Sequence, residues 1–408
     1  MICFFTERFS ASDIGGLKSY LRHMCHSLQK KDHEVAIITL LSLRDSKKKE
    51  VIDEIPVYRL FCGDFIDRIY EYNQLSPEEK SEKESTLFHE NDIELTSFLL
   101  AKSLNEFLDE HKVYSIHFHN SFFLGPNALY ILKQQFPRRY VPSFYFWCHS
   151  PDKYLVLPNG ENSSLYDALA SFQNQFKRIF AVSQAVHDEL LHAGISSTVN
   201  YLGIDCDFFK KQEINQEQLL NECNFPDNSF VYLYSGRLLE EKGLGILPDI
   251  FQNLLNRDSS FAKGRFLILG EGEFAETLQK KISEKSLEDY FHITFTLDNE
   301  KLREYYSLAD LFIYPTKREA LGLSLLEAMS CSLPCIASDL PATAEVIHHL
   351  QNGILVPMNN HNEFIRWIST LYNDKALRNS LGFKAHKTIK EKFSHKKHLE
   401  FFLRKLIH

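Results

Sequence analysis

Short apolar runs alternate with amphipathic stretches along the first half of the chain. The amphipathic stretches, such as residues 17–30 and 95–111, repeat apolar residues with the period of a helix. The apolar runs have the length of buried strands and lie at residues 2–5, 35–39, 57–60, 115–119, 144–148 and 179–182. Repetition of strand, helix and strand predicts a parallel sheet with crossover helices.

The same pattern restarts after a polar stretch at residues 210–228. The second set of apolar runs lies at residues 230–234, 265–269, 292–295, 311–314, 335–337 and 353–356. Helical segments fit between them at residues 246–256, 274–286, 301–308 and 323–330. We therefore predict an α/β protein with two Rossmann-like domains, residues 1–209 and 210–388, and a final helix at 389–408 that packs back on the first domain.

Composition supports two domains and excludes several functions. The chain has 408 residues, which exceeds what one hydrophobic core usually supports. Its net charge of −8 argues against nucleic-acid binding, which needs a basic surface. No apolar run approaches the roughly 20 residues of a transmembrane helix, and the N-terminus lacks the pattern of a signal peptide, so we expect a cytoplasmic protein. The eight cysteines form no CxxC pair, which favours reduced thiols.

Two segments are expected at the surface. Residues 64–92 are rich in Glu, Lys, Ser and Asn and are interpreted as a partly helical insertion. The final helix is basic and amphipathic, and we interpret it as a solvated helix. Weak peripheral contact with a membrane is the alternative, although Glu391 and Glu400 interrupt its positive charge.

Glycines follow two of the predicted strands, where open parallel sheets bind their ligands. Gly15 and Gly16 lie between the first strand and the first helix, and Gly270 and Gly272 follow the strand at residues 265–269. Glycine lets a backbone approach a phosphate closely, and a following helix N-terminus favours an anion. Gly15 and Gly16 alone are better explained as a simple loop. A lone Gly-x-Gly at Gly270 and Gly272 is weak evidence, but its place between a strand and a helix strengthens it.

Basic residues follow the first strand of the second half. Gly236 and Arg237 come directly after it, and Lys242 lies five residues further on. Arginine offers a planar fork of donors and lysine a mobile point charge, so both suit a diphosphate. A solvated basic turn is the alternative interpretation.

The segment from Glu319 to Glu327 is the most informative. Glu319 follows a predicted strand, and Glu327 lies about one turn inside the next helix. The backbone amides of Gly322, Leu323 and Ser324 open that helix and are expected to face a ligand. Glu319 is suited to bind sugar hydroxyls, and Glu327 to accept hydrogen bonds from a ribose diol. The alternative is a helix start with ordinary surface glutamates.

These residues together resemble the Glu-x7-Glu motif of the retaining GT-B glycosyltransferases of family GT4. The run around it, EALGLSLLEAMSCSLPCIASD, is similar to the family along its full length, as are GRLLEEKG from Gly236, GEGE from Gly270 and NGILVP from Asn352. In the first half, the opening around Gly16, the IHFH run that ends at His119, the HSP turn at His149 and the YLGID run resemble the family. The resemblance implies the GT-B fold, in which two Rossmann-like domains face each other across a central cleft.

The resemblance also implies a site. Its donor-binding residues are Gly15, Gly16, Gly236, Arg237, Lys242, Gly270, Gly272, Glu319, Gly322, Leu323, Ser324 and Glu327. Its catalytic residues are His149, Arg237, Lys242 and Glu319.

Each of these residues has an implied role. Arg237 and Lys242 neutralise the donor diphosphate, Glu327 holds the ribose, and Glu319 holds the transferred sugar with the amides of the following helix. Gly16 approaches the phosphate from the opposite domain. His149 lies beside the sugar and the acceptor.

We therefore expect a hexosyltransferase that needs no metal and no cofactor, because fixed cations neutralise the leaving diphosphate. Asp205 and Asp207 form an Asp-x-Asp, but they lie at the domain joint, so we interpret them as structural. Retention is expected through front-side attack, since Glu319 is implied to bind hydroxyls. The donor is expected to be a UDP-sugar. The acceptor stays open between a glycan, a lipid-linked sugar, a small molecule and a protein.

The sequence departs from the family in the loop after residues 292–295, which is shorter and leaves the donor base in doubt. His117 and His119 suggest a metal site, but a packing and hydrogen-bonding pair is the favoured interpretation. The alternatives to a transferase are an inactive nucleotide-sugar-binding homologue, a GT-B epimerase or phosphorylase, and a nicotinamide dehydrogenase. The last ranks lowest, because no full Gly-x-Gly-x-x-Gly follows the first strand.

We expect Glu327→Ala to weaken donor binding, because it removes the acceptor of the ribose hydroxyls. Lys242→Ala should lower turnover, because it removes positive charge that stabilises the leaving group. Isothermal titration and a turnover assay measure the two effects. Unchanged binding and turnover in both folded variants contradict this assignment of the site.

Overall fold

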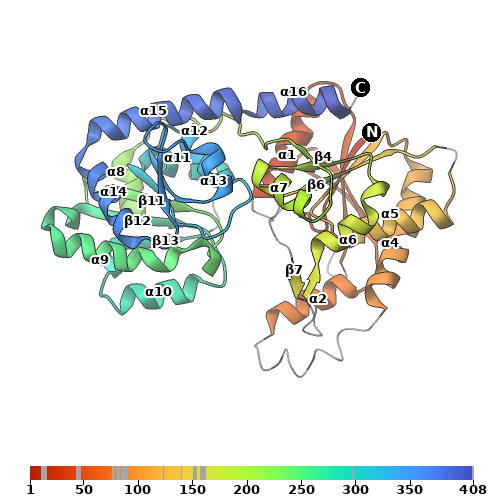
Figure 1. Cartoon of the computed structure of the whole chain (residues 1–408), viewed down its shortest axis with the longest axis horizontal. Helices are drawn as coiled ribbons and strands as arrows, with labels where there is room; N and C mark the ends of the chain where they lie inside the picture. The colour runs from red at the N-terminus through yellow and green to blue at the C-terminus, as the bar shows by residue number, and fades with distance from the viewer. Residues whose placement is uncertain are drawn as a thin grey trace. The chain divides into compact units, whose positions relative to one another are not determined.

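The computed structural model describes residues 1–10, 16–42, 47–75, 79, 83, 91–122, 124–138, 140–149, 154–156, 162–295 and 298–406. Within it the chain divides into two compact units, Met1–Asn200 and Tyr201–His408, and each is an α/β unit (Figure 1). Gly15, residues 296–297 of the loop that departs from the family, and most of the second half of the predicted insertion lie outside the described residues.

The first unit contains an eight-stranded sheet with the order β10-β9-β6-β5-β1-β2-β4-β3 among its described residues. Neighbouring strands in this sheet are parallel except β3 and β4. A separate antiparallel pair joins β7 and β8. The strands are β1 (Ile2–Phe5), β2 (Val35–Leu41), β3 (Lys49–Ile52), β4 (Ile55–Phe61), β5 (Ser115–His119), β6 (Ser143–Cys148), β7 (Tyr154–Val156), β8 (Asn162–Ser164), β9 (Arg178–Ala181) and β10 (Thr198–Val199).

Helix α1 of the first unit packs one apolar face against this sheet. In α1 the residues Tyr20, Leu21, Met24, Cys25 and Leu28 are buried, which is the spacing of a single helix face. The helices are α1 (Gly16–Gln29), α2 (Phe65–Gln74), α4 (Asp92–Glu110), α5 (Leu124–Gln135), α6 (Leu165–Phe172) and α7 (Gln184–His192).

The second unit contains a six-stranded parallel sheet with the order β13-β12-β11-β14-β15-β16. Its central strands are buried on both faces, and their continuous apolar runs reflect this. The strands are β11 (Phe230–Ser235), β12 (Gly264–Leu269), β13 (Phe291–Thr294), β14 (Leu311–Tyr314), β15 (Cys335–Asp339) and β16 (Ile354–Pro357).

The helices of the second unit lie on both sides of its sheet. In Figure 1, α9 and α10 lie on one side and α11 and α12 on the other, as right-handed crossovers in opposite directions require. The helices are α8 (Gln216–Glu222), α9 (Leu247–Arg257), α10 (Ala275–Ser283), α11 (Asn299–Leu308), α12 (Leu323–Ser330), α13 (Pro341–Val346), α14 (His361–Asn373), α15 (Lys375–Lys392) and α16 (His395–Leu406).

All twelve strands predicted from apolar runs are present in the structure, within a few residues of their predicted ends. Four described strands were not predicted: β3, β7, β8 and β10, of which β7 and β8 have three residues each. β3 lies at the sheet edge, where its side chains are mostly exposed and its sequence has no apolar run. β10 has only two residues.

The two compact units divide between Asn200 and Tyr201, and the sequence predicts the domain boundary between residues 209 and 210. The segment after Asn200 is held by the second unit: the N–H of Ile204 donates to the carbonyl of Phe393 at 2.8 Å, and the N–H of His395 donates to the carbonyl of Ile204 at 2.8 Å. The hydroxyl of Ser330 donates to the carbonyl of Phe209 at 2.6 Å. The predicted domain boundary and the interpretation of residues 210–228 as a linker stay predictions. Packing of the final helix on the first unit stays a prediction.

The strand order of each sheet reverses at one point. In the second unit the chain runs from β11 outward through β12 and β13, and then returns to the other side of β11 with β14. In the first unit the reversal lies between β1 and β5. Ligands of open α/β sheets bind beyond the carboxyl ends of the strands at such reversals, so these two places are where a site is expected.

Candidate donor and acceptor sites

Three predicted segments of the second unit follow adjacent strands and meet at one edge of the sheet. Residues 236–243 follow β11, residues 270–272 follow β12, and residues 315–322 follow β14. The strand order reverses between β11 and β14, so the carboxyl end of this pair forms the centre of the candidate donor site.

The turns after β11 and β12 pack backbone to backbone. The N–H of Leu238 donates to the carbonyl of Glu271 at 2.8 Å, and the N–H of Phe274 donates to the carbonyl of Leu238 at 2.9 Å. A β-carbon on Gly270 would lie 1.9 Å from the carbonyl oxygen of Gly236, and one on Gly272 would lie 2.3 Å from that of Leu238. Both glycines also have positive φ angles. Contact between the two turns is therefore itself sufficient reason for the Gly-x-Gly.

Lys242 and Glu319 form an ion pair at the strand reversal. The Nζ of Lys242 lies 3.1 Å from Oε2 of Glu319, and each side chain is 13% exposed. Nζ also donates to the carbonyl of Arg318 at 3.3 Å. The family resemblance implies separate ligands for these two side chains, the diphosphate for Lys242 and the sugar for Glu319. The structure brings them together, so one ligand placed there contacts both charges.

Close backbone contact produces this ion pair. Gly243 has a φ of 71°, and a β-carbon on it would lie 2.1 Å from the carbonyl oxygen of Pro315. The N–H of Lys317 donates to the carbonyl of Glu241 at 2.7 Å. These contacts hold the turn that carries Lys242 against the turn that carries Glu319.

Further groups fix the carboxylate of Glu319. The hydroxyl of Tyr314 donates to its Oε2, and the N–H of Ala320 donates to its Oε1 at 3.0 Å. Arg237, the second predicted cation, is exposed, and its carbonyl accepts a hydrogen bond from the hydroxyl of Tyr234 at 3.0 Å. The structure therefore holds Lys242 tightly and leaves the Arg237 side chain at the surface.

Glu327 lies in α12 as predicted. Gly322 caps this helix with a φ of 84°, and Leu323 and Ser324 begin it. The hydroxyl of Tyr306 donates to Oε2 of Glu327 at 2.9 Å. Burial raises the pKa of Glu327 to about 7, and the hydrogen bond from Tyr306 opposes that rise. The amides of the helix start and this carboxylate lie on the same short helix, which agrees with a site for a polar ligand.

In the first unit His149 follows β6, and Gly16 begins α1. Nε2 of His149 lies 2.7 Å from Nδ1 of His119, and the N–H of His149 donates to Oδ1 of Asn120 at 2.7 Å. Asn120 has a φ of 53°, which lets it turn back toward β6 after β5 ends. Two neighbouring strands thus fix the position of His149.

His117 is a hydrogen-bonding histidine of the core. Its Nδ1 accepts from Nε1 of Trp147 at 3.2 Å, so its Nε2 carries the proton and bonds Oγ of Ser115 at 3.0 Å. Burial lowers its pKa to about 3. Asp205 is likewise structural in its contacts, because its Oδ1 accepts from the N–H of Asp207 at 2.9 Å and from that of Phe208 at 3.1 Å.

Sequence reasoning missed several groups at these strand ends. Glu7 follows β1, and its Oε1 accepts from the hydroxyl of Ser121 after β5 at 2.8 Å, at the strand reversal of the first unit. Burial raises the pKa of Glu7. In the second unit the missed groups are the hydroxyls of Tyr234, Tyr306 and Tyr314. Tyr234 and Tyr314 each end an apolar run in the sequence, and this position could have identified them as candidate site residues.

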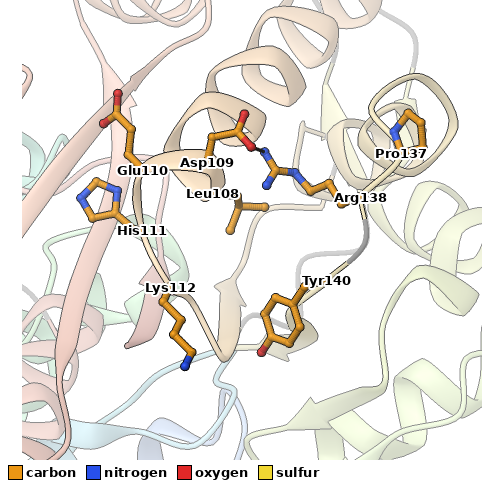
Figure 2. A pocket seen from close by; sticks show the side chains of 8 residues that line it. All are labelled: Leu108, Asp109, Glu110, His111, Lys112, Pro137, Arg138 and Tyr140. Carbon is orange, nitrogen blue, oxygen red and sulfur yellow. Dashed lines mark ion pairs between the residues drawn. The ribbon is translucent and has the colours of Figure 1, made fainter.

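A pocket of about 510 Å³ lies elsewhere in the first unit, between the ends of α4 and α5 and the strands that follow them (Figure 2). Arg138 and Asp109 form an ion pair of 2.9 Å on its wall. His111 and Tyr140 also line it and precede β5 and β6, so the pocket lies at the amino edge of the sheet. It is therefore separate from the predicted site residues.

Two family models match the chain. Glycosyltransferase Family 4 matches residues 14–208, and Glycosyl transferases group 1 matches residues 215–388. The chain belongs to glycosyltransferase family 4. The second match contains every predicted donor-binding residue from Gly236 to Glu327.

Curated relatives of this glycosyltransferase are distant. The chain is 24% identical over 262 residues to the alpha-monoglucosyldiacylglycerol synthase of Acholeplasma laidlawii, which covers 62% of this chain and 64% of that protein. It is 27% identical over 219 residues to the sulfoquinovosyl transferase SQD2 of Arabidopsis thaliana, covering 52% and 40%. It is 22% identical over 303 residues to the N-acetyl-alpha-D-glucosaminyl L-malate synthase of Bacillus anthracis, covering 73% and 75%. The alignments thus span less than two thirds of the first two relatives.

Solved structures show that the fold is GT-B. Sucrose-phosphate synthase from Thermosynechococcus elongatus superposes with a TM-score of 0.76 at 17% identity, covering 99% of this chain and 97% of that one. HepE from Anabaena, solved in complex with UDP-glucose, superposes with a TM-score of 0.74 at 17% identity, covering 100% and 99%. Among the described residues no helix of this glycosyltransferase has both the length and the apolar character to cross a bilayer.

We expect Gly272→Ala to separate the turns after β11 and β12, because its β-carbon meets the carbonyl of Leu238 and its φ is positive. The cost should be about 2 kcal/mol or more, seen as a fall of several degrees in the melting temperature. Gly245→Ala is the control, since Gly245 has no positive φ and faces only the ends of the Phe274 and Lys281 side chains. Equal melting temperatures for the two variants contradict the turn contact.

Proposed function

We propose that the chain transfers a sugar from a nucleotide diphosphate sugar, with a UDP-sugar favoured, to a hydroxyl group of an acceptor. The observation that carries this proposal is the pairing of Lys242 with Glu319 at the strand reversal of the second unit. A cation and a carboxylate side by side suit a ligand that joins a phosphate to a polyol. A nucleotide diphosphate sugar has both groups in adjacent positions.

We also propose that this transfer needs no metal. The bond between C1 of the sugar and the diphosphate oxygen breaks with negative charge on the leaving group, which needs positive charge nearby. Lys242 lies in a site with low exposure, where a charge interacts more strongly than in water. Arg237, exposed after β11, supplies a second cation with a planar fork for phosphate oxygens.

A UDP-sugar is the favoured donor, with support from a structural neighbour. HepE was solved in complex with UDP-glucose. Glu327, on the helix that begins at Gly322, supplies a carboxylate for the ribose diol.

Retention of the anomeric configuration is the proposed stereochemistry. The names of the relatives from Acholeplasma laidlawii and Bacillus anthracis specify alpha-linked products. Common nucleotide sugars carry an α-linked sugar, so an α product means retention. In a front-side attack the acceptor oxygen bonds to C1 on the face that the diphosphate leaves, and the acceptor proton passes to the leaving phosphate oxygen.

The acceptor is proposed only as a hydroxyl compound. The names of two relatives include a diacylglycerol and a malate, which have little in common beyond an oxygen nucleophile. In the first unit the groups at the carboxyl ends of the strands include Glu7 and His149, which suit hydrogen bonds to hydroxyls.

We expect UDP or a UDP-sugar to raise the melting temperature more than the GDP and ADP counterparts do, with and without EDTA. A ligand at 100 times its dissociation constant adds about 2.7 kcal/mol to the stability of the folded state. Proton NMR of the product formed with the best donor then reads the anomeric configuration. The matched control is Glu327→Gln, which keeps the side-chain volume and removes the charge.

Each outcome decides one part of the proposal. A β product from an α donor overturns retention, and loss of the shift or of turnover with EDTA overturns metal independence. Binding of a nucleotide sugar without turnover for any acceptor class supports the inactive homologue. Absence of any shift across the panel overturns the proposed function.

A further inference from the structure

Tyr306 lies beneath the helix that carries Glu327. It belongs to α11, and its side chain is 1% exposed. Its hydroxyl lies 2.9 Å from Oε2 of Glu327 and 3.3 Å from the carbonyl oxygen of Ser324. A hydroxyl has one proton to donate, and the shorter contact to the charged acceptor is the stronger. Tyr306 therefore donates to Oε2 of Glu327, and Oε1 is the oxygen that we assign to the ligand.

Two opposing effects set the charge of Glu327. Burial raises its pKa to about 7, and the bond from Tyr306 holds that pKa down. Cys331, which directly follows α12, also interacts with this carboxylate, and burial raises the pKa of its thiol well above the usual value. A thiol that stays protonated adds no charge near pH 7. Tyr306 is thus the group that stabilises the charged form of Glu327, which is the form that accepts hydrogen bonds from two hydroxyls.

We propose that Tyr306 is a positioning residue of the donor site, which orients the carboxylate of Glu327 and keeps it an acceptor for the ribose diol. This inference rests on the proposed function, because it assigns Glu327 to the ribose. It adds a specific requirement: the hydroxyl of one buried tyrosine sets the pH range in which the donor binds. A phenylalanine ring at this position does not fulfil this requirement, because it has no hydroxyl to donate to Glu327.

Tyr232 provides a matched control in the same unit. It lies in β11, is fully buried, and stacks on Phe266 with ring centroids 4.8 Å apart. Its hydroxyl has no hydrogen-bond partner among the described residues. Removal of an unpaired buried hydroxyl costs little, so Tyr232→Phe should leave both stability and donor binding unchanged.

The first test uses the ligand-free protein. Carbon NMR of labelled glutamate carboxyl groups follows the titration of Glu327, with Glu327→Gln to assign the signal. In the native chain the midpoint should lie near 7. In Tyr306→Phe it should rise by about one pH unit, and in Tyr232→Phe it should not move. An unmoved midpoint in Tyr306→Phe overturns the inference whether or not the chain binds a nucleotide.

The second test measures the affinity for UDP-glucose from about pH 6 to about pH 8.5, a range in which the doubly esterified diphosphate stays ionised. Affinity of the native chain should rise as pH passes through 7, because Glu327 loses its proton. Tyr306→Phe should lose about fivefold at pH 7, approach a tenfold loss near pH 6, and regain most of the affinity at about pH 8.5. A loss that is the same at every pH means a purely structural role and overturns the inference.

The two tests separate the two proposals. Failure of the native chain to bind UDP-glucose or any other nucleotide sugar removes the ribose role of Glu327 and hence overturns the inference together with the proposed function. Binding by the native chain with an unchanged pH midpoint in Tyr306→Phe overturns the inference alone. If Tyr306→Phe shifts the NMR midpoint of Glu327 and the midpoint of UDP-glucose affinity by the same amount, the result supports the inference and the proposed function.

Discussion

The candidate donor site depends on backbone turns that pack more closely than residues with a β-carbon allow. Gly243 lies against the carbonyl of Pro315, and Gly270 lies against the carbonyl of Gly236. These contacts join the turns after β11, β12 and β14 into one rigid edge. The ion pair between Lys242 and Glu319 forms because its two turns are held together in this way. The glycines therefore contribute to the site indirectly, because they fix the positions of the side chains that contact the ligand.

The buried charges at this edge of the sheet lower the stability of the fold, and binding of a polar ligand explains why they are present. A largely buried pair such as Lys242 and Glu319 loses hydration, and its attraction often only offsets that loss. Glu327 is raised in pKa because burial disfavours its charge. A protein selected for stability alone has little reason to keep these groups. A protein that must hold a polyol and a diphosphate has a direct reason, because a dry site strengthens each contact to the ligand.

Histidines of the first unit show how one motif serves two purposes. His117 and His119 lie two residues apart on β5, so by strand geometry their side chains share one face. His117 is neutral and uses both ring nitrogens inside the core. His119 instead contacts His149 at the carboxyl end of β6. Position along the strand decides the difference, because only the strand end lies where ligands of such sheets bind.

The sequence by itself determined the two Rossmann-like units, their strands and the segments that carry the predicted site. It did so because apolar periodicity is local, and because Glu319 and Glu327 stand in a run with a distinctive family pattern. Only the tertiary structure decided that Lys242 contacts Glu319, that Tyr306 contacts Glu327 and that Glu7 meets Ser121. These pairs lie 21 to 114 residues apart in sequence. Strand order brings them together, and strand order follows from the packing of the whole sheet, which no local pattern encodes.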